Sequence, residues 1–223
     1  MAKDRMAVLT AMMAQGVIPV FYHPDVEVCT NVIQACANGG AKCIEFTNRG
    51  DFAPHVFLEV ARHFAKADAS VIMGVGSVLD APTAGIYIAN GANFVVGPVL
   101  NADVAKGCNR RKIPYSPGCG SASEISAAEE LGVEIVKIFP GTQVGGPEFV
   151  KAVLGPMPWT RIMPTGGVDP TEESLRAWFG AGIVAAGMGS KLVTSDLLKT
   201  KDYKGIENKV AETIALIKKI RGK

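Results

Sequence analysis

A lysine inside an apolar segment is the residue of this chain best suited to covalent chemistry. Lys137 lies in EIVKIFPG, and alternation along a strand places it on the face opposite to Val136 and Ile138. If those two residues pack against helices, Lys137 points into the interior, where an ammonium group costs free energy unless it is paired or loses its proton. It is therefore either an ion-paired lysine or an amine of lowered pKa that attacks a ketone and forms a Schiff base.

A glutamate in a second apolar segment has the same inward parity. In AKCIEFTNRG, Glu45 alternates with Ile44 and Phe46, so that it would enter the same interior as Lys137. It either pairs with the lysine or moves protons as a general base, and Arg49 is spaced to bind a substrate carboxylate bidentately. A lysine and a carboxylate that face one interior favour an imine-forming enzyme.

Two glycine-rich turns, MPTGGV at 163–168 and GMGSK at 187–191, indicate a phosphate site. Backbone N–H groups after the last two strands of a barrel commonly bind phosphate, although glycines also serve simply to make tight turns. Lys191 either adds charge to this site or points into solvent from the first turn of a helix. Ser77, in GVGSV at 74–78, offers a further hydroxyl near the end of a strand. The candidate substrate-binding residues of the two turns are Thr165, Gly166, Gly167, Gly189 and Ser190.

These residues need a scaffold that brings the ends of several strands together. Eight short apolar segments alternate with segments of helical pattern, which predicts an α/β fold: one (β/α)8 TIM barrel domain over residues 1–223 with a short N-terminal helix. A doubly wound open sheet is the alternative, but the chain lacks G-x-G-x-x-G after its first strand. The predicted strands are 17–22, 41–46, 70–75, 93–97, 113–116, 134–139, 161–164 and 182–186.

Three helix starts can be recognised from residues that cap helices. Asp25 precedes VEVCTNVIQACA, and Ser121 with Glu124 forms a capping box ahead of ISAAEEL. Asp169 is predicted as an N-cap, with Pro170 at the first helical position. These signals support helices between the predicted strands.

The composition excludes several classes of protein. With 48% hydrophobic and 20% charged residues the chain is not disordered, and 23 basic against 21 acidic residues, without long runs, suggest neither a nucleic-acid nor a membrane partner. The five cysteines form no C-x-x-C pair, so buried free thiols in a reducing cytoplasm are expected. The three histidines lack metal-ligand spacing, so a His-rich metal site is not expected, while one built from scattered carboxylates stays open.

In order and spacing, segments between residues 17 and 193 resemble the family of 2-keto-3-deoxy-6-phosphogluconate (KDPG) and 4-hydroxy-2-oxoglutarate (KHG) aldolases. That family's fold, a (β/α)8 barrel usually assembled as a trimer, agrees with the predicted strands. Three departures leave the exact substrate open: Ser77 stands where threonine is usual, Pro140-Gly141-Thr142 replaces Pro-Ala-Glu, and a lysine follows the last turn. The matching segments are IPV at 18–20, IEFTNR at 44–49, GVGSV at 74–78, GP at 97–98, IPYSPG at 113–118, VKIFP at 136–140, MPTGGV at 163–168 and GS at 189–190.

The resemblance implies a homotrimeric class I aldolase that needs no metal and no cofactor. Lys137 would form the Schiff base, Glu45 would be the acid/base residue, and Arg49 with Ser77 would hold the pyruvate carboxylate. The implied reaction is reversible cleavage of a phosphorylated 2-keto-3-deoxy acid to pyruvate and glyceraldehyde 3-phosphate, with cleavage of 4-hydroxy-2-oxoglutarate to pyruvate and glyoxylate as a second activity. The residues implied to shape the cavity or bind the phosphate are Pro98, Pro117, Gly166, Gly167 and Ser190.

Two other functions fit some of the same residues. A phosphate-binding barrel isomerase, epimerase or decarboxylase would keep both glycine turns without an imine at Lys137. A non-catalytic barrel would bind a phosphorylated metabolite without turnover. The inward lysine, carboxylate and arginine favour the aldolase, and the sequence leaves open whether a gluconate-derived, galactonate-derived or unphosphorylated acid is preferred.

Overall fold

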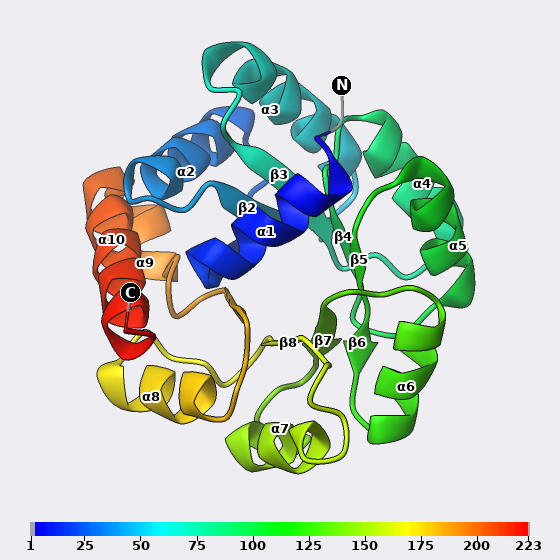
Figure 1. Ribbon diagram of the computed structural model, residues 1–223. Coiled ribbons are helices and arrows are strands. Elements are labelled where there is room, and N and C mark those ends of the chain that lie inside the picture. The colour runs from blue at the N-terminus through cyan, green and yellow to red at the C-terminus, as the bar shows by residue number, and fades with distance from the viewer. Residues whose placement is uncertain (1–2, 223) are drawn as a thin grey trace.

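The computed structural model describes residues 3–222, in which short strands alternate with helices that surround them (Figure 1). The strands are β1 (Val17–Phe21), β2 (Cys43–Thr47), β3 (Ile72–Gly76), β4 (Val95–Val96), β5 (Tyr115–Ser116), β6 (Gly118–Cys119), β7 (Val136–Ile138), β8 (Ile162–Pro164) and β9 (Ala186–Met188). The helices are α1 (Arg5–Gln15), α2 (Val26–Asn38), α3 (Ala53–Ala67), α4 (Ala81–Ala89), α5 (Ala102–Arg111), α6 (Ala122–Glu130), α7 (Gly146–Leu154), α8 (Glu172–Gly180), α9 (Ser195–Lys199) and α10 (Tyr203–Ile220).

The strands form a curled parallel sheet with the helices outside it (Figure 1). Six strands pair in the order β5-β4-β3-β2-β1-β9, and three pair in the order β6-β7-β8. Pro117 lies between β5 and β6, and an isolated parallel bridge joins Thr165, which follows β8, to Gly187 of β9. The ends of the two sheets therefore lie next to each other, and the carboxyl ends of all the strands point the same way.

Alternate residues of each strand enter two different cores. Ile44 and Val136 belong to the larger core, which the helices cover, whereas Cys43 and Ile135 belong to a smaller cluster inside the curl. Residues of one parity in these strands therefore point inwards, as the sequence predicted for β2 and β7. The buried residues of the inner cluster are Val8, Leu9, Met12, Ile18, Cys43, Ile72, Phe94, Val96, Ile135, Met163 and Ala185.

Helix α1 closes one end of the curled sheet. Its Val8, Leu9 and Met12 are buried in the inner cluster, and Figure 1 shows the helix lying across the middle of the curled sheet. Removing these large apolar side chains from water is the main force that holds the helix there. The predicted N-terminal helix is thus confirmed, and access to the interior is left at the opposite end.

Polar contacts fix both ends of the chain at this closed end. The Arg5 guanidinium donates to the Glu134 carboxylate at 2.7 Å and to Asn109 Oδ1 at 2.9 Å. After α10, Arg221 Nη1 donates to the backbone carbonyl of Met13 at 2.8 Å. The beginning and the end of the described chain therefore lie at one end of the molecule.

The caps explain where several helices begin. Asp25 and Ser121 accept hydrogen bonds from backbone N–H groups in the first turns of α2 and α6, as predicted. The prediction for Asp169 is wrong, because α8 begins at Glu172 and the hydroxyl of Thr171 accepts the capping bond from Ser174 N. Asp169 is thereby left in the loop after β8.

Two strand predictions need correction. The last strand begins at Ala186 and not at residue 182, because its ladder with β1 starts where Val17 supplies a partner. The predicted fifth strand continues beyond Pro117 as β6, since proline has no N–H for the ladder and divides one extended segment into two short strands.

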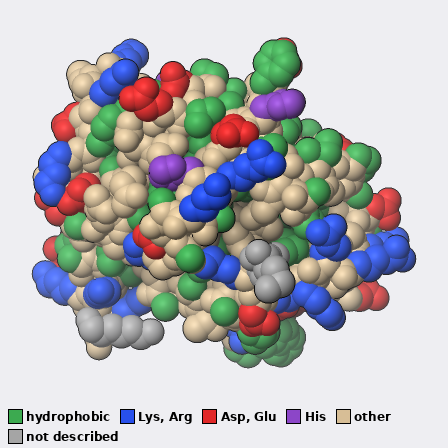
Figure 2. Space-filling view, turned by 90° about the horizontal axis from the view of Figure 1, so that it is seen from above, with side chains coloured by type: hydrophobic (Ala, Val, Ile, Leu, Met, Phe, Trp, Pro, Cys, Tyr) green, Lys and Arg blue, Asp and Glu red, His purple; other side chains and the backbone are tan. Residues whose placement is uncertain are grey.

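The surface carries charges of both signs. Figure 2 shows basic and acidic side chains interspersed over the face seen from above, without a large field of one sign. Among residues 3–222, no helix is both long and apolar enough to cross a bilayer. All five cysteines are free and buried, which confirms the prediction made from their spacing.

Candidate active site

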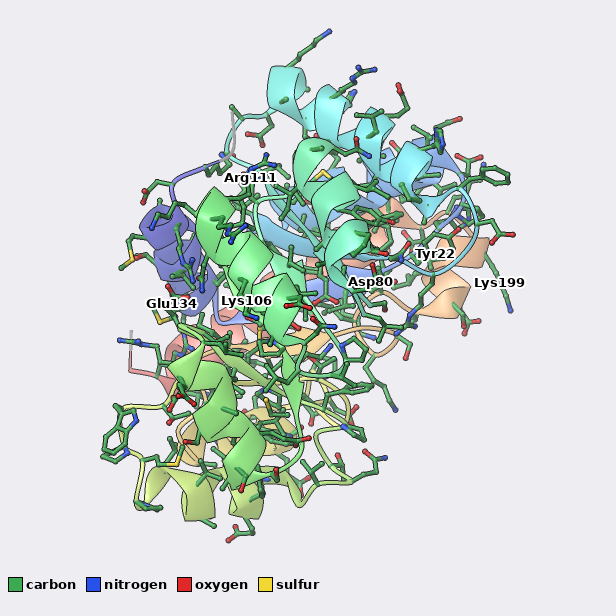
Figure 3. All side chains as sticks on the ribbon, turned by 90° about the vertical axis from the view of Figure 1, so that its right-hand side faces the viewer. Tyr22, Asp80, Lys106, Arg111, Glu134 and Lys199 are labelled. Atoms are coloured by element: carbon green, nitrogen blue, oxygen red, sulfur yellow. The ribbon has the colours of Figure 1, made fainter. Side chains whose placement is uncertain are left out.

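The carboxyl ends of the strands lie at the open end of the molecule. Figure 3 shows Tyr22 and Asp80, which follow β1 and β3, on the side away from Arg111 and Glu134, which lie near α1. Active sites of α/β proteins with parallel strands form at the carboxyl ends, because loops and side chains from several strands converge there. The candidate residues are therefore examined at this end.

Lys137 lies inside the curled sheet, two residues after Ile135 of the inner cluster and nearer the carboxyl end of the strand. It is only 5% exposed, its neighbour in β8 is Met163, and its Nζ lies 4.8 Å from the centre of the Phe139 ring. Lys137 forms none of the ion pairs found within residues 3–222. Burial lowers the pKa of its amine, and the charge of Arg49 lowers it further, while Glu45 acts in the opposite direction. The geometry therefore favours a reactive amine over an ion-paired lysine.

Glu45 enters the same interior from β2. It is 1% exposed, and its Oε2 has no hydrogen-bond partner within the described residues. Its side chain lies over Gly76 of β3, where a Cβ would overlap the carboxylate. Burial raises the pKa of Glu45, and the charges of Lys137 and Arg49 offset part of that effect. A buried carboxylate oxygen without a partner can accept a hydrogen bond or a proton from a bound substrate.

Arg49 and Ser77 come together where the loops after β2 and β3 meet. Arg49 Nε donates to Ser77 Oγ at 3.4 Å, and Ser77 has a positive φ of 60°. The loop is held from below by Asn48, whose backbone N–H donates to Gly76 O at 2.8 Å and whose side chain accepts from Tyr87 at 2.8 Å. A guanidinium and a hydroxyl fixed side by side can bind one carboxylate.

Both glycine turns line a single cavity of about 660 Å³. Gly166 and Gly167 have positive φ values of 90° and 79°, and a Cβ on Gly167 would overlap Thr142. Thr165 Oγ1 is buried without a partner among residues 3–222, and Gly187 leaves the room for it. The predicted residues that the structure brings together in this cavity are Arg49, Thr165, Gly166, Gly167, Gly189, Ser190 and Lys191. Backbone N–H groups and hydroxyls gathered in this way can bind an anion.

Phe139 connects this cavity with the buried amine. Its ring lines the cavity and lies beneath the Nζ of Lys137. The lining also includes polar residues that were not predicted as site residues, namely Thr47, Tyr22, Asp169 and Ser195. The inward parity of β2 could have indicated Thr47, and Tyr22 and Asp169 follow β1 and the first glycine turn directly. A molecule in the cavity can thus extend from the glycine turns towards Lys137.

The two prolines that were expected to shape the cavity lie beside the strand that pairs with β7. Pro98 does not line the cavity; its carbonyl packs against Gly118, where a Cβ would overlap it. Pro117 accepts a hydrogen bond from Lys137 N at 3.0 Å. Both residues therefore contact β6 or β7, next to the strand that carries Lys137.

The pH at which Lys137 becomes reactive should depend on its burial and on the charges of Glu45 and Arg49. Because burial lowers its pKa, acetylation of Lys137 by acetic anhydride should reach half of its maximal rate below pH 10.5, the ordinary value. Glu45→Gln should move the midpoint further down, and Arg49→Gln should move it up, since the two charges act in opposite directions. Peptide mass spectrometry against exposed Lys151 as the internal reference measures these rates. If both variants shifted the acetylation midpoint in the same direction, the electrostatic explanation would be wrong.

Comparison with known proteins gives one consistent result. The family model of KDPG and KHG aldolases matches residues 8–209. The 2-dehydro-3-deoxy-phosphogluconate aldolase of Treponema pallidum (strain Nichols) is 30% identical over 210 residues, which cover 94% of this chain and 97% of that protein. The chain therefore belongs to the family of KDPG and KHG aldolases.

Solved structures show the same fold. The KDPG aldolase of Legionella pneumophila, with pyruvate captured as a covalent carbinolamine intermediate, aligns with a TM-score of 0.84 at 24% identity, covering 95% of this chain and 98% of that one. The aldolase of Zymomonas mobilis ZM4 with 3-phosphoglycerate aligns with a TM-score of 0.81 at 25% identity, covering 96% and 97%. The curled parallel sheet is thus the fold of this family.

Proposed function

We propose that this protein is a class I aldolase that reversibly cleaves KDPG to pyruvate and glyceraldehyde 3-phosphate. We also propose that it cleaves 4-hydroxy-2-oxoglutarate to pyruvate and glyoxylate. The observation that carries the proposal is the buried amine of Lys137, which belongs to none of the ion pairs of residues 3–222, inside a sheet that Glu45 also enters. The family and the carbinolamine in the Legionella pneumophila aldolase support an amine as the reacting group.

The proposed mechanism follows from the positions of these side chains. The neutral Lys137 amine attacks the C2 ketone, and loss of water from the resulting carbinolamine gives a protonated imine. The imine accepts the electrons of the C3–C4 bond as it breaks, while Glu45 takes the proton of the C4 hydroxyl. Glu45 then protonates C3 of the enamine, and hydrolysis releases pyruvate. Arg49 and Ser77 hold the carboxylate of the substrate throughout.

Detection of the products tests the proposed function. The purified protein is incubated with KDPG, and pyruvate and glyceraldehyde 3-phosphate are identified by mass spectrometry. Equal amounts of the two products, together with pyruvate-dependent borohydride labelling, would support the aldolase. Turnover of a phosphorylated sugar without any label would instead support the isomerase, epimerase or decarboxylase, and binding without turnover would support a metabolite-binding barrel.

The phosphate of KDPG is proposed to bind between the two glycine turns, with Gly166, Gly167, Gly189 and Ser190 as donors. The cavity position of these residues and the phosphorylated ligand of the Zymomonas mobilis aldolase support this assignment. Lys191 also lines the cavity, although it is 69% exposed at its side chain and lies 3.8 Å from Asp169. We propose that Lys191 is a phosphate contact that Asp169 partly neutralises.

Lys191→Ala is expected to lower kcat/KM for KDPG by up to about fivefold, because an exposed ion pair contributes at most roughly 1 kcal/mol. Asp169→Asn should raise it, since the substitution removes a negative charge beside a dianion. Cleavage of 4-hydroxy-2-oxoglutarate, which has no phosphate, is the matched control and should change little in both variants. Equal effects on the two substrates would show that Lys191 does not contact the phosphate.

We further infer a closed (β/α)8 barrel that forms a single domain over residues 1–223. Parallel pairing on both sides of β1, the interruption at Pro117 and the bridge between Thr165 and Gly187 support eight positions around a ring. A cytoplasmic location is inferred from the five buried cysteines, which are all free.

An exposed apolar surface supports the proposed homotrimer. Phe52, Leu79 and Val99 lie in the loops after the adjacent strands β2, β3 and β4, and Ile86 lies on α4; all four are exposed, Phe52 at 78%. Exposed apolar side chains on neighbouring β–α units are candidates for an interface between subunits. We call these four residues the apolar patch.

Ile86→Glu is expected to convert a trimer into monomers, because a charge would have to be buried at the apolar patch. Size-exclusion chromatography with light scattering should give three times the 23.4 kDa chain mass before the change and a single chain mass after it. Trp159→Glu, at an exposed aromatic residue outside the patch, is the control and should leave the mass unchanged. A monomeric unsubstituted protein would refute the trimer.

A further inference from the structure

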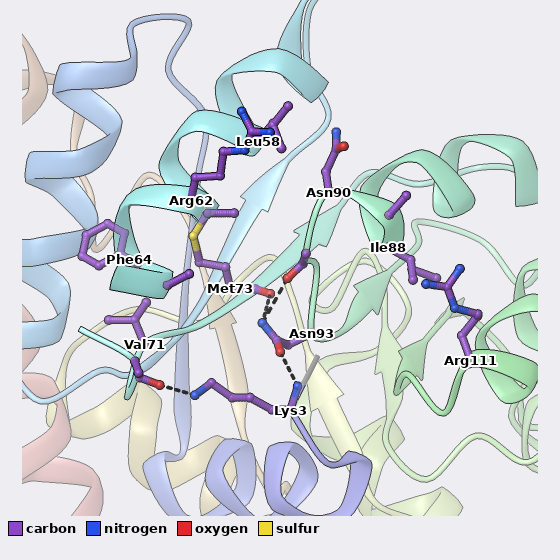
Figure 4. Close-up of a pocket in the computed structure, with 15 residues that line it drawn as sticks. Lys3, Leu58, Arg62, Phe64, Val71, Met73, Ile88, Asn90, Asn93 and Arg111 are labelled. Carbon is purple, nitrogen blue, oxygen red and sulfur yellow. Dashed lines mark hydrogen bonds between the residues drawn. The ribbon is translucent and has the colours of Figure 1, made fainter. Parts of the chain in front are cut away.

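A second hollow lies far from the candidate active site, between α3 and α4. Its volume is about 640 Å³. Lys3, just before α1, and Arg111, at the end of α5, belong to its lining (Figure 4). We call this hollow the α3–α4 groove.

The floor of the α3–α4 groove is apolar. Phe64, Val71, Met73 and Ile88 are buried there, and the exposed side is bordered by small residues of α3 and of the turn after α4. A hollow of this size can accommodate the body of a small organic molecule, whereas a bare inorganic anion would fill little of it.

The rim of the groove is strongly cationic. Lys3, Arg62 and Arg111 surround it, as Figure 4 shows, and no Asp or Glu of the described residues lines it. The Lys3 ammonium donates to Ala69 O and keeps two further protons for another acceptor. Arg62 has only a long contact of 3.6 Å to Glu59. The three positive charges are therefore largely available to a ligand.

A buried amide fixes this arrangement. Asn93 Oδ1 accepts from Lys3 N at 2.9 Å, and its Nδ2 donates to the backbone carbonyls of Met73 and Gly91 at 3.4 and 3.2 Å. The hydrogen bond from Lys3 N to Asn93 holds Lys3 at the groove. Because both polar atoms of the Asn93 side chain are bonded within the protein, a ligand would bind to the cationic side chains and not to Asn93. The fold thus fixes the backbone of Lys3 at the rim of the groove.

From this combination we infer that the α3–α4 groove binds a small organic anion, with an apolar body on the floor and one acidic group between Lys3, Arg62 and Arg111. The apolar floor and the cationic rim together match a molecule of that kind better than either a neutral hydrophobic compound or a free inorganic ion. The site is separate from the cavity at the carboxyl ends of the strands and does not depend on the proposed reaction.

Fluorescence titration with 8-anilinonaphthalene-1-sulfonate, an aromatic sulfonate, tests this inference on the native protein. One molecule should bind per chain, and octyl phosphate and octanoate should displace it, their relative strengths showing which acidic group is preferred. At constant ionic strength, saturating pyruvate with inorganic phosphate should not displace it, because both are proposed to bind at the other end of the molecule. The neutral analogue N-phenyl-1-naphthylamine should bind more weakly.

Two substitutions and a matched control locate the site. The double variant Arg62→Gln and Arg111→Gln should weaken binding of the sulfonate by roughly tenfold, and increased salt should weaken it in the unsubstituted protein. Arg110→Gln, at the exposed residue beside Arg111 that does not line the groove, should have no effect. All three side chains are exposed, so that the thermal midpoint should be retained.

Several results would overturn the inference. Unchanged affinity in the double variant, an equal loss in Arg110→Gln, or equal binding of the neutral analogue would show that the cations do not recognise the ligand. Displacement by pyruvate and phosphate would place the probe in the other cavity. Loss of binding when the apolar patch carries Ile86→Glu, without loss in the double variant, would place it between subunits.

Discussion

Replacement of Lys137 by arginine is expected to reduce turnover of KDPG to the uncatalysed background and to abolish pyruvate-dependent borohydride labelling. A guanidinium cannot form the imine, and its pKa is too high to provide a neutral nucleophile. Labelling of the unsubstituted protein should be found by peptide mass spectrometry on the peptide that contains Lys137. Lys151→Arg, at an exposed lysine of α7, is the control and should label normally.

A second variant separates chemistry from folding. Lys137→Met matches the lysine side chain as far as Cε and removes the amine from a position where burial already disfavours the charge. We expect this variant to be inactive and to unfold at a temperature no lower than the unsubstituted protein. Label on another lysine, or turnover in either variant, would exclude the imine at Lys137.

Glu45→Gln is expected to lower turnover by about 10²–10⁴-fold, the usual range for loss of a general acid–base group. The exchange of pyruvate methyl protons in deuterated water measures the proton transfer directly and should slow by a similar factor. Glu130→Gln, at an exposed glutamate of α6, provides the control. Unchanged exchange in the Glu45 variant would remove this carboxylate from the base role.

The same substitution should affect stability in a direction that depends on pH. The folded protein raises the pKa of Glu45 above the ordinary 4.5, so the stability gained from its protonation is present at low pH and is lost as the pH rises through the raised value. Glutamine does not titrate. The thermal midpoint of Glu45→Gln relative to the unsubstituted protein should therefore increase between about pH 5 and about pH 8.

The deepest part of the candidate site was the most accessible to prediction from the sequence. Alternation in the segments around Lys137 and Glu45 indicated their inward parity, and Cys43 and Ile135 of the inner cluster confirm it. Both residues are polar groups in otherwise apolar strands. Such a position costs free energy and is therefore easy to recognise as a candidate functional position.

Boundaries and loop positions were less predictable, for physical reasons. The apolar residues around Ala186 continue on both sides, and only the partner strand determines where the ladder begins. Both Asp169 and Thr171 can cap a helix, and the fold uses the second. That Lys191 lies near Asp169, and that the Pro98 carbonyl packs against Gly118, depends on how separate loops pack, which local sequence does not determine.

The closed end of the molecule has a practical consequence for the use of this protein. Lys3 and Arg221 are both anchored there by hydrogen bonds, while the cavity opens among the loops at the other end. A linker attached to either terminus would therefore leave from the back of the molecule. The protein could be immobilised on a bead, or fused to another enzyme, with its cavity still facing the reaction medium.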